Sequence, residues 1–194
     1  MGGADKAALV VGDARIIDRQ LAVLRTVADD VRIVADDRNR YSGIGVRVIP
    51  DRIANAGPLG GLHAALLDAA HDRVVVLACD LPFVTAALLE RLLVEFGSGE
   101  AIDAVVPRSA RGVEPLCAVY AVRCADAARK RIERGELQVL GLLEDVRVLE
   151  LGPDAVAPYD DGSVFLNVNT PHDYARATGR VELNEKPFKD RITE

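Results

Sequence analysis

One acidic residue stands where a metal ion could bind. Residues 73–79, RVVVLAC, form an apolar run too short for a helix, which is typical of a strand buried on both faces of a parallel sheet, and Asp80 follows directly. A carboxylate at the exit of a buried strand is well placed to bind Mg²⁺, which prefers oxygen ligands and often takes only one or two from protein when phosphates supply the rest. The alternative interpretation is an Asp that caps the next turn.

A glycine-rich segment, AGPLGGLHAAL (56–66), connects a strand to a helix. Gly57, Gly60 and Gly61 there would let backbone N–H groups and a helix N-terminus approach a ligand closely, although ordinary turn chemistry explains them equally well. Asp51 follows the preceding strand and could accept a hydrogen bond from a ribose hydroxyl or a base amine. It is equally well interpreted as a turn residue.

The chain opens with MGGADKAAL, in which Gly2 and Gly3 precede Lys6. Such a segment can fold around an anion, with the lysine ammonium acting as a point charge on phosphate oxygens. A surface lysine is the alternative.

Near the other end, FLNVNTPHDY (165–174) carries Asn167 and Asn169 on either side of Val168, before a Thr-Pro turn that opens a helix. The amides interrupt the apolar alternation that builds a sheet. In open α/β sheets, ligands bind beyond the carboxyl ends of strands, so the role of these amides depends on which other segments reach the same place.

The histidines and cysteines favour structural roles. The histidines lack metal-ligand spacing, and the three cysteines form no Cys-x-x-Cys motif or disulfide framework. We expect all six to be structural, with the cysteines buried as small apolar residues in a reducing compartment. They are His63, His71, His172, Cys79, Cys117 and Cys124.

Periodicity predicts the elements that would position these residues. Amphipathic or apolar helical spacing and short β-branched runs alternate along the chain, which indicates a three-layer α/β domain with a mainly parallel sheet. The expected helices span 15–30, 61–70, 85–96 (with Thr85 as N-cap) and 124–135. The expected strands span 31–35, 46–50, 73–79, 103–107, 116–122, 146–151 and 164–168.

Composition sets the outer limits. With 194 residues, 49% hydrophobic and 28% charged, the chain has the balance of one globular domain, which we place at 1–179 with a frayed polar tail at 180–194. A net charge of -6 argues against nucleic-acid and anionic-membrane partners. The chain has no apolar stretch long enough to span a membrane and no signal segment, so we expect a cytoplasmic protein.

Taken together, five segments resemble the molybdenum cofactor guanylyltransferases of the nucleotidyltransferase superfamily. They are MGGADKAAL, GPLGGLHAAL, ACDLPFV, EPLCAVY and FLNVNTPHDY, in this order, and the resemblance covers residues 1 to about 178. The most specific element is NVNTP, because relatives that use CTP or activate sugars usually carry acidic residues at these positions. The resemblance therefore implies that Asn167 and Asn169 are active-site amides.

The resemblance implies a Rossmann-like α/β/α nucleotidyltransferase fold and a reaction. GMP would pass from GTP to the phosphate of molybdopterin, releasing pyrophosphate, with Mg²⁺ as the metal and molybdoenzymes or their chaperones as candidate recipients of the product. By residue, Lys6 would contact the triphosphate and Asp80 would hold Mg²⁺. The guanosine would lie between Asp51 and the Gly57, Pro58, Gly60 and Gly61 segment, and Gly2 and Gly3 would belong to the phosphate loop. Asn167 and Asn169 would sit by the metal and the pterin phosphate.

The sequence departs from the family pattern at its start. Relatives carry an apolar strand, then Leu-Ala-Gly-Gly and Arg-Met-Gly, and Met1 falls on the Met of that pattern. A chain without that apolar strand would lack about five buried aliphatic side chains. At roughly 2 kcal/mol each, their loss would lower the free energy of unfolding by ~10 kcal/mol, which is comparable to the whole stability of a domain. We therefore expect the native protein to begin upstream of Met1, with an in-frame apolar segment that ends in a glycine-rich turn.

A second departure lies in ERGELQVLGLLE (133–144), where Leu137 and Gln138 stand where relatives often place an arginine. One phosphate or pterin contact is then lost, or is supplied by Arg108, Arg111 or Arg134. The sequence gives no basis for choosing among the three.

Two other functions stay open. The first is a non-catalytic relative that binds molybdopterin or its nucleotide form and hands it to a partner. The second is a related nucleotidyltransferase that uses CTP or a sugar phosphate acceptor, against which NVNTP argues.

Overall fold

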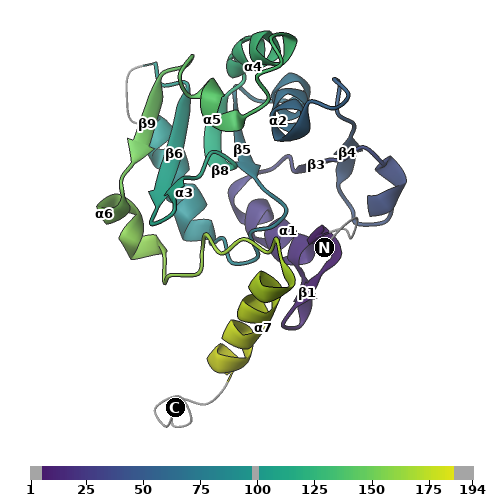
Figure 1. The fold of residues 1–194 in the computed structure, drawn as a ribbon, viewed down its shortest axis with the longest axis vertical. Coiled ribbons are helices and arrows are strands. Elements are labelled where there is room, and N and C mark those ends of the chain that lie inside the picture. The colour runs from purple at the N-terminus through teal and green to yellow at the C-terminus, as the bar shows by residue number, and fades with distance from the viewer. Residues whose placement is uncertain (1–5, 98–100, 186–194) are drawn as a thin grey trace.

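Helices and strands alternate along the chain, as the periodicity predicts (Figure 1). The computed structural model describes residues 6–97 and 101–185. The helices are α1 Ile16–Val27, α2 Gly57–Asp68, α3 Ala86–Gly97, α4 Cys124–Glu133, α5 Val139–Leu142, α6 Pro153–Val156 and α7 Pro171–Glu185, with 3₁₀ turns η1 Lys6–Ala8, η2 Arg38–Tyr41 and η3 Ala157–Tyr159. The strands are β1 Val10–Val11, β2 Ala14–Arg15, β3 Arg32–Val34, β4 Arg47–Ile49, β5 Arg73–Leu77, β6 Ala104–Ser109, β7 Gly112–Val113, β8 Cys117–Ala121 and β9 Val148–Leu151.

The strand pairing is mixed rather than mainly parallel, which corrects one expectation from the sequence. Strands β3 and β4 pair in parallel, as do β6 and β9, whereas β5–β8, β6–β8, β6–β7 and β1–β2 are antiparallel. The reason lies in the connection between β6 and β8, which is a tight hairpin through β7. A short hairpin reverses the chain, whereas a parallel neighbour needs a long crossover.

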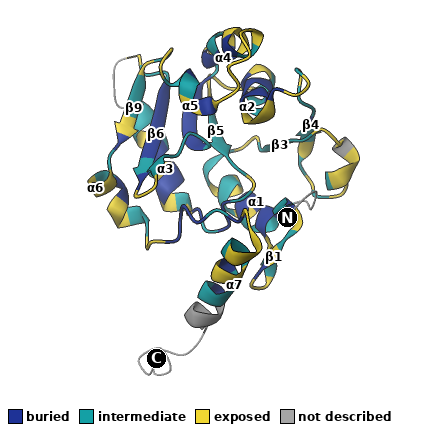
Figure 2. Cartoon of the chain, in the orientation of Figure 1, coloured by how far each residue is buried: buried dark blue, intermediate teal, exposed yellow. Residues whose placement is uncertain are grey.

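The central sheet is covered by helices on both faces, which confirms the three-layer α/β class. On β6, Ala104 and Val106 pack with α2 and α4, while Val105 between them packs with α3 on the other face. On β8, Tyr120 and Val119 divide between the same two faces. This alternation is the period-two pattern of a strand buried on both sides, and Figure 2 shows buried residues along these strands.

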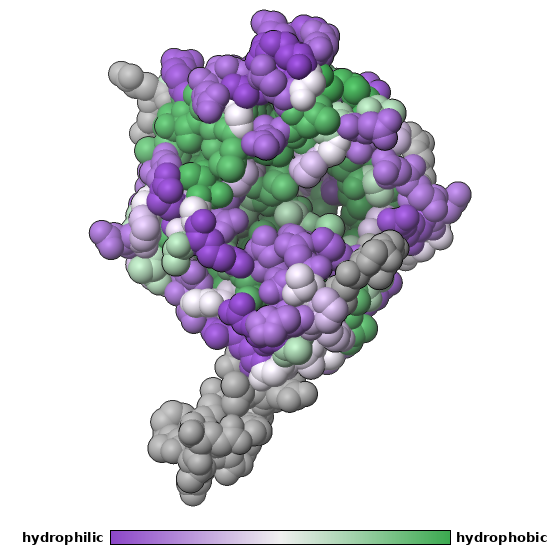
Figure 3. Space-filling model, in the orientation of Figure 1, coloured by the Kyte–Doolittle hydropathy of each residue, from purple (hydrophilic) through white to green (hydrophobic). Residues whose placement is uncertain are grey.

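The edges of β3 and β5 that face away from their partners have no strand beside them in the part of the chain that the structure describes. The apolar side chains of both strands are half-buried, although β5 was expected to be buried on both faces. Figure 3 shows hydrophobic residues gathered in a hollow in the middle of the face of the molecule that it draws. An additional first strand, as expected from the family pattern, stays a prediction.

The segment 164–168, VFLNV, is not a strand, contrary to expectation. Its backbone donors are taken by a turn, because Val164 N donates to the Asp160 carboxylate and Leu166 N to Ser163 O. The segment is nevertheless buried at four of its five positions, so the apolar run correctly indicated core packing but not sheet pairing.

Helix α7 begins with a capping box and passes the domain boundary expected at residue 179. Thr170 Oγ1 accepts from Asp173 N, while the Asp173 carboxylate accepts from Thr170 N. The helix packs Ala177 and Val181 against the β1–β2 hairpin and continues to Glu185. Residues 180–185 are therefore helical, and 186–194 lie outside the described residues.

Cys79 is exposed, which corrects the expectation that all three cysteines are buried. It lies beyond the end of β5, where the chain leaves the core. Cys117 and Cys124 are buried as expected. Burial raises the pKa of the Cys117 thiol to about 12 and that of Cys124 to about 11, so both stay protonated at neutral pH.

The start of α3 agrees with the expected boundary. Leu88 N donates to Thr85 Oγ1 at 3.3 Å, which confirms Thr85 as the N-cap.

No helix in the described part of the chain combines the length and the apolar character needed to cross a lipid bilayer.

Replacing Tyr120 with phenylalanine is expected to lower the free energy of unfolding by about 1–2 kcal/mol, measured by urea denaturation. The fully buried Tyr120 hydroxyl donates to Pro115 O at 2.7 Å, and its loss leaves that carbonyl without its partner. Tyr174→Phe is the matched control, because its hydroxyl donates to Val10 O at 2.8 Å in an exposed setting. Equal losses in both variants would contradict the prediction.

Candidate active site

A backbone hydrogen bond joins the two segments that the sequence singled out most strongly. Val168 N donates to Asp80 O at 2.9 Å, so the loop after β5 and the NVNTP segment run side by side. Val168 is buried, whereas Asn167 and Asn169 on either side of it are accessible. The amides therefore flank the loop that carries Asp80, as the sequence interpretation required.

A buried glutamine on α1 holds the Asp80 loop in place. Gln20 Nε2 donates to Ala78 O at 2.7 Å and to Leu81 O at 3.0 Å, one on each side of Asp80. Gln20 was not predicted from the sequence. Its position could have indicated it, since it lies one turn after Ile16 and beside Leu21 on the apolar face of an amphipathic helix.

The Asp80 carboxylate has the features of a metal ligand. Its Oδ1 is buried and has no hydrogen-bond partner among residues 6–97 and 101–185, a costly arrangement that a bound cation would relieve. No group of three or more His, Cys, Asp or Glu side chains suited to a metal occurs among the described residues.

Lys6 reaches the same place from the start of the chain. Its Nζ donates to Asn169 Oδ1 at 2.5 Å, so the structure brings these two candidate site residues together. Because the amide oxygen accepts from the lysine, the Asn169 NH₂ group is left to donate elsewhere. Gly2 and Gly3 lie outside the described residues.

A second cation contacts the other asparagine. Arg111 Nη2, from the β6–β7 turn, donates to Asn167 Oδ1 at 3.1 Å. Glu114 lies close by and accepts from Ser109 Oγ at 2.7 Å. Burial, with a smaller contribution from the Asp80 carboxylate, raises the pKa of Glu114. Glu114 was not predicted from the sequence as a site residue, although it stands in the EPLCAVY segment that carries the family resemblance.

Asp51 and the glycine segment form a separate part of the site. Asp51 Oδ1 is buried without a partner, and burial followed by the neighbouring Asp36 carboxylate raises the pKa of Asp51. A Cβ on Gly61 would lie 3.6 Å from this oxygen, which places the start of α2 beside the carboxylate. No hydrogen bond among the described residues joins Asp51 to Asp80, so the structure does not unite the two parts directly.

The glycines at the start of α2 differ in their local roles. Gly57, followed by Pro58, has a φ of +58°, a conformation that favours glycine. A Cβ on Gly60 would lie 2.6 Å from the Ala56 Cβ, so glycine there serves close packing. Only Gly61 is placed next to a candidate ligand-binding side chain.

His63 is buried on α2, as expected for a structural histidine, but its Nδ1 has no hydrogen-bond partner. Burial first, and the charges of Arg52 and Arg129 second, lower its pKa below the ordinary 6.5. The unfolded chain then binds more protons just below that pH, and stability falls as the pH drops.

The free energy of unfolding is accordingly expected to decrease as the pH is lowered below 6.5, and this slope should be smaller in His63→Leu. Urea titrations at several pH values measure it. His71→Gln, at an exposed position, serves as the control and should keep the wild-type slope. An unchanged slope in His63→Leu would reject the assignment.

Known proteins resemble this chain over most of its length. A family model described as "MobA-like NTP transferase domain" matches residues 1–148. A "Probable molybdenum cofactor guanylyltransferase" from Pelotomaculum thermopropionicum is 36% identical over 190 residues, covering 93% of this chain and 91% of the relative. A "Molybdenum cofactor guanylyltransferase" from Desulfosudis oleivorans is 31% identical over 182 residues, covering 93% and 89%.

A solved structure is similar as well. It is the molybdopterin-guanine dinucleotide biosynthesis protein A from Archaeoglobus fulgidus, with a TM-score of 0.77 and 28% identity. The match covers 93% of this chain and 92% of the other.

Proposed function

This chain belongs to the MobA-like NTP transferase family, and from that premise we propose that it transfers GMP from GTP to the phosphate of molybdopterin and releases pyrophosphate. The observation that carries the proposal is the convergence of Lys6, Asp80, Asn167 and Asn169 at one place from three separate segments. We place the reaction in the cytoplasm, in keeping with the reducing compartment that the cysteine pattern favours.

Enzymes of this family generally use a divalent metal ion, and we propose Mg²⁺ bound by Asp80. The buried, unpartnered Oδ1 supports this assignment. Bound there, Mg²⁺ would neutralise negative charge on the triphosphate and on the pyrophosphate leaving group.

The protein's own side chains position the two substrates. The Lys6 ammonium, oriented by Asn169 Oδ1, binds the triphosphate of GTP, and the free NH₂ groups of Asn167 and Asn169 donate to phosphate oxygens. An oxygen of the acceptor phosphate attacks the α-phosphorus, and the bond between the α-phosphorus and the bridging oxygen breaks. The electron pair leaves with pyrophosphate. No general base is required, because the acceptor phosphate is already ionised at neutral pH.

Asp51 and the segment from Gly57 to Gly61 bind the guanosine in this proposal. The buried Asp51 Oδ1 has no donor among the described residues and lies beside Gly61, which has no side chain of its own. A carboxylate there can accept from a ribose hydroxyl or from the base amine of guanine.

Pyrophosphate release with molybdopterin as acceptor tests the function. The chain is expected to turn over GTP with Mg²⁺ and to bind GTP more tightly than CTP by calorimetry. Preference for CTP would favour a related nucleotidyltransferase. A folded protein that binds molybdopterin but neither nucleotide would favour the non-catalytic alternative.

A further inference from the structure

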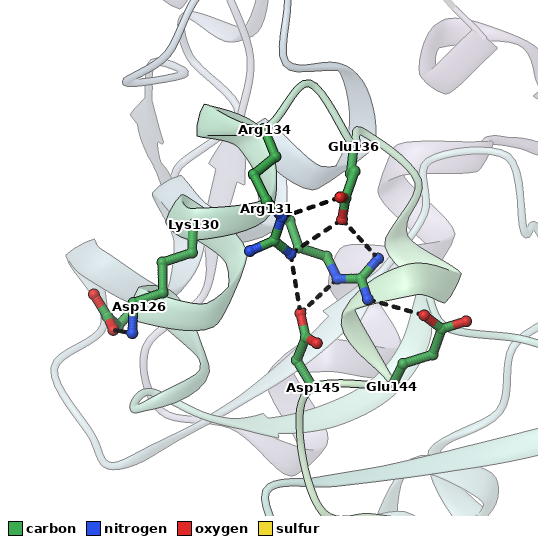
Figure 4. Close-up of polar contacts among 7 residues, drawn as sticks. All are labelled: Asp126, Lys130, Arg131, Arg134, Glu136, Glu144 and Asp145. Carbon is green, nitrogen blue, oxygen red and sulfur yellow. Dashed lines mark hydrogen bonds and ion pairs between the residues drawn. The ribbon is translucent and has the colours of Figure 1, made fainter.

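Three arginines could replace the phosphate or pterin contact that the sequence lacks at Leu137 and Gln138, and two of them already have anionic partners. Arg108 forms a bidentate pair with the Glu150 carboxylate. Arg134 donates to Glu136 from two nitrogens at 3.0 Å each and lies near Asp145, as Figure 4 shows. The positive charges of Arg108 and Arg134 are therefore already paired with carboxylates of the protein itself.

Arg111 differs because it forms no salt bridge with any described residue. Within the part of the chain that the structure describes, its guanidinium makes one hydrogen bond, from Nη2 to Asn167 Oδ1, which leaves most of its donors for a ligand. The side chain is exposed and lies at the accessible amide of the NVNTP segment. An exposed, unpaired guanidinium beside an active-site amide is available to an anionic ligand.

The turn that carries Arg111 is fixed by its own contacts. Ser109 pairs with Gly112 across the hairpin, and Gly112 has a φ of +129°, a conformation that side chains strongly disfavour. Arg111 N donates to Ser109 Oγ at 3.0 Å, and that hydroxyl donates to Glu114. The backbone of Arg111 is therefore held before any ligand binds, which reduces the entropic cost of binding.

We propose that Arg111 binds the phosphate monoester of the acceptor substrate, a contact that rests on the proposed function. The two asparagines each hold one cation, Lys6 at Asn169 and Arg111 at Asn167. The reaction likewise brings together two anions, a triphosphate and a phosphate monoester, that repel each other. Lys6 is assigned to the triphosphate, so Arg111 faces the acceptor. Its planar fork matches two oxygens of a terminal phosphate.

Arg111→Ala is expected to lower kcat/KM for molybdopterin by about 10- to 150-fold, the range for one lost charge-assisted hydrogen bond, while the Kd for GTP stays unchanged. Arg111→Lys should recover only part of the loss, because it keeps the charge but not the fork. Arg108→Ala is the matched control on the same hairpin and should change neither value. Equal loss for GTP and molybdopterin, or no loss for either, would overturn the assignment.

A second measurement separates this site from the proposed activity. In a Lys6→Ala background, which removes the other cation, inorganic phosphate should raise the Tm, and it should not do so in Lys6→Ala/Arg111→Ala. If the double variant responds to phosphate as the single variant does, the Arg111 site is wrong, whatever the wild-type protein catalyses. If phosphate binding depends on Arg111 but the wild type makes no product, the site stands and the proposed reaction fails.

Discussion

Asp80→Asn is expected to reduce kcat by about 10³-fold while the Tm stays within about 2 °C of wild type. The substitution preserves the shape of the side chain but removes the negative charge that would bind Mg²⁺. Because Asp80 Oδ1 is buried and accepts no hydrogen bond from any described residue, the substitution breaks no hydrogen bond of that oxygen within the described chain. The loss should therefore appear in turnover and metal dependence rather than in folding.

The rate should be measured as pyrophosphate release across a range of Mg²⁺ concentrations, with the Tm taken from the same preparations. Asp154→Asn, at an exposed position on α6, serves as the control and should behave as wild type. Wild-type rates in Asp80→Asn would reject the metal assignment. A large drop in Tm would instead assign Asp80 a structural role in the loop held by Gln20.

Lys6→Ala is expected to raise the KM for GTP by about 100-fold, because a charge-assisted hydrogen bond to phosphate contributes about 1.5–3 kcal/mol. Binding of molybdopterin should change much less. The contact between Lys6 and Asn169 is exposed, so leaving the amide oxygen without its partner costs little stability.

Separate titrations of GTP and molybdopterin check this prediction. Lys130→Ala provides a control, since that lysine forms an exposed ion pair with Asp126 on α4. A similar loss of affinity for both substrates would mean that Lys6 acts by organising the site rather than by binding the triphosphate.

Under the proposed roles of Lys6 and Arg111, mutations should affect the binding of the two substrates separately. If Lys6 serves the triphosphate and Arg111 the acceptor phosphate, each variant impairs one substrate and spares the other. The two asparagines lie two residues apart and connect both cations to the Asp80 loop through Val168. In the proposed reaction, this geometry would place a donor and an acceptor phosphate next to one another.

Periodicity in the sequence determined the type and place of most elements. Helices α1 and α3 follow directly from their apolar spacing, and β5 from its apolar run that ends before Asp80. The residues flagged for chemistry at Asp80, Asn167 and Asn169 lie together in the structure. These features are local, because a side chain's own neighbours in sequence fix its helix or strand face.

The local sequence pattern did not predict which strands pair with each other or which side chains are accessible. VFLNV was expected to be a strand, but Asp160 and Ser163 take its backbone groups into a turn. The expected parallel sheet is mixed because β6 and β8 are joined through a tight hairpin. Such outcomes depend on which distant backbone groups become partners, and nothing in a short window encodes that choice.

The sequence by itself determined the α/β class, most of the element order and the candidate residues for binding a metal and phosphates. Only the tertiary structure decided that Gln20 holds the Asp80 loop, and that Arg111 is the unpaired cation while Arg108 and Arg134 are not. The physical reason is that an arginine's role depends on whether a carboxylate lies within reach. That distance is set when segments far apart in sequence pack together.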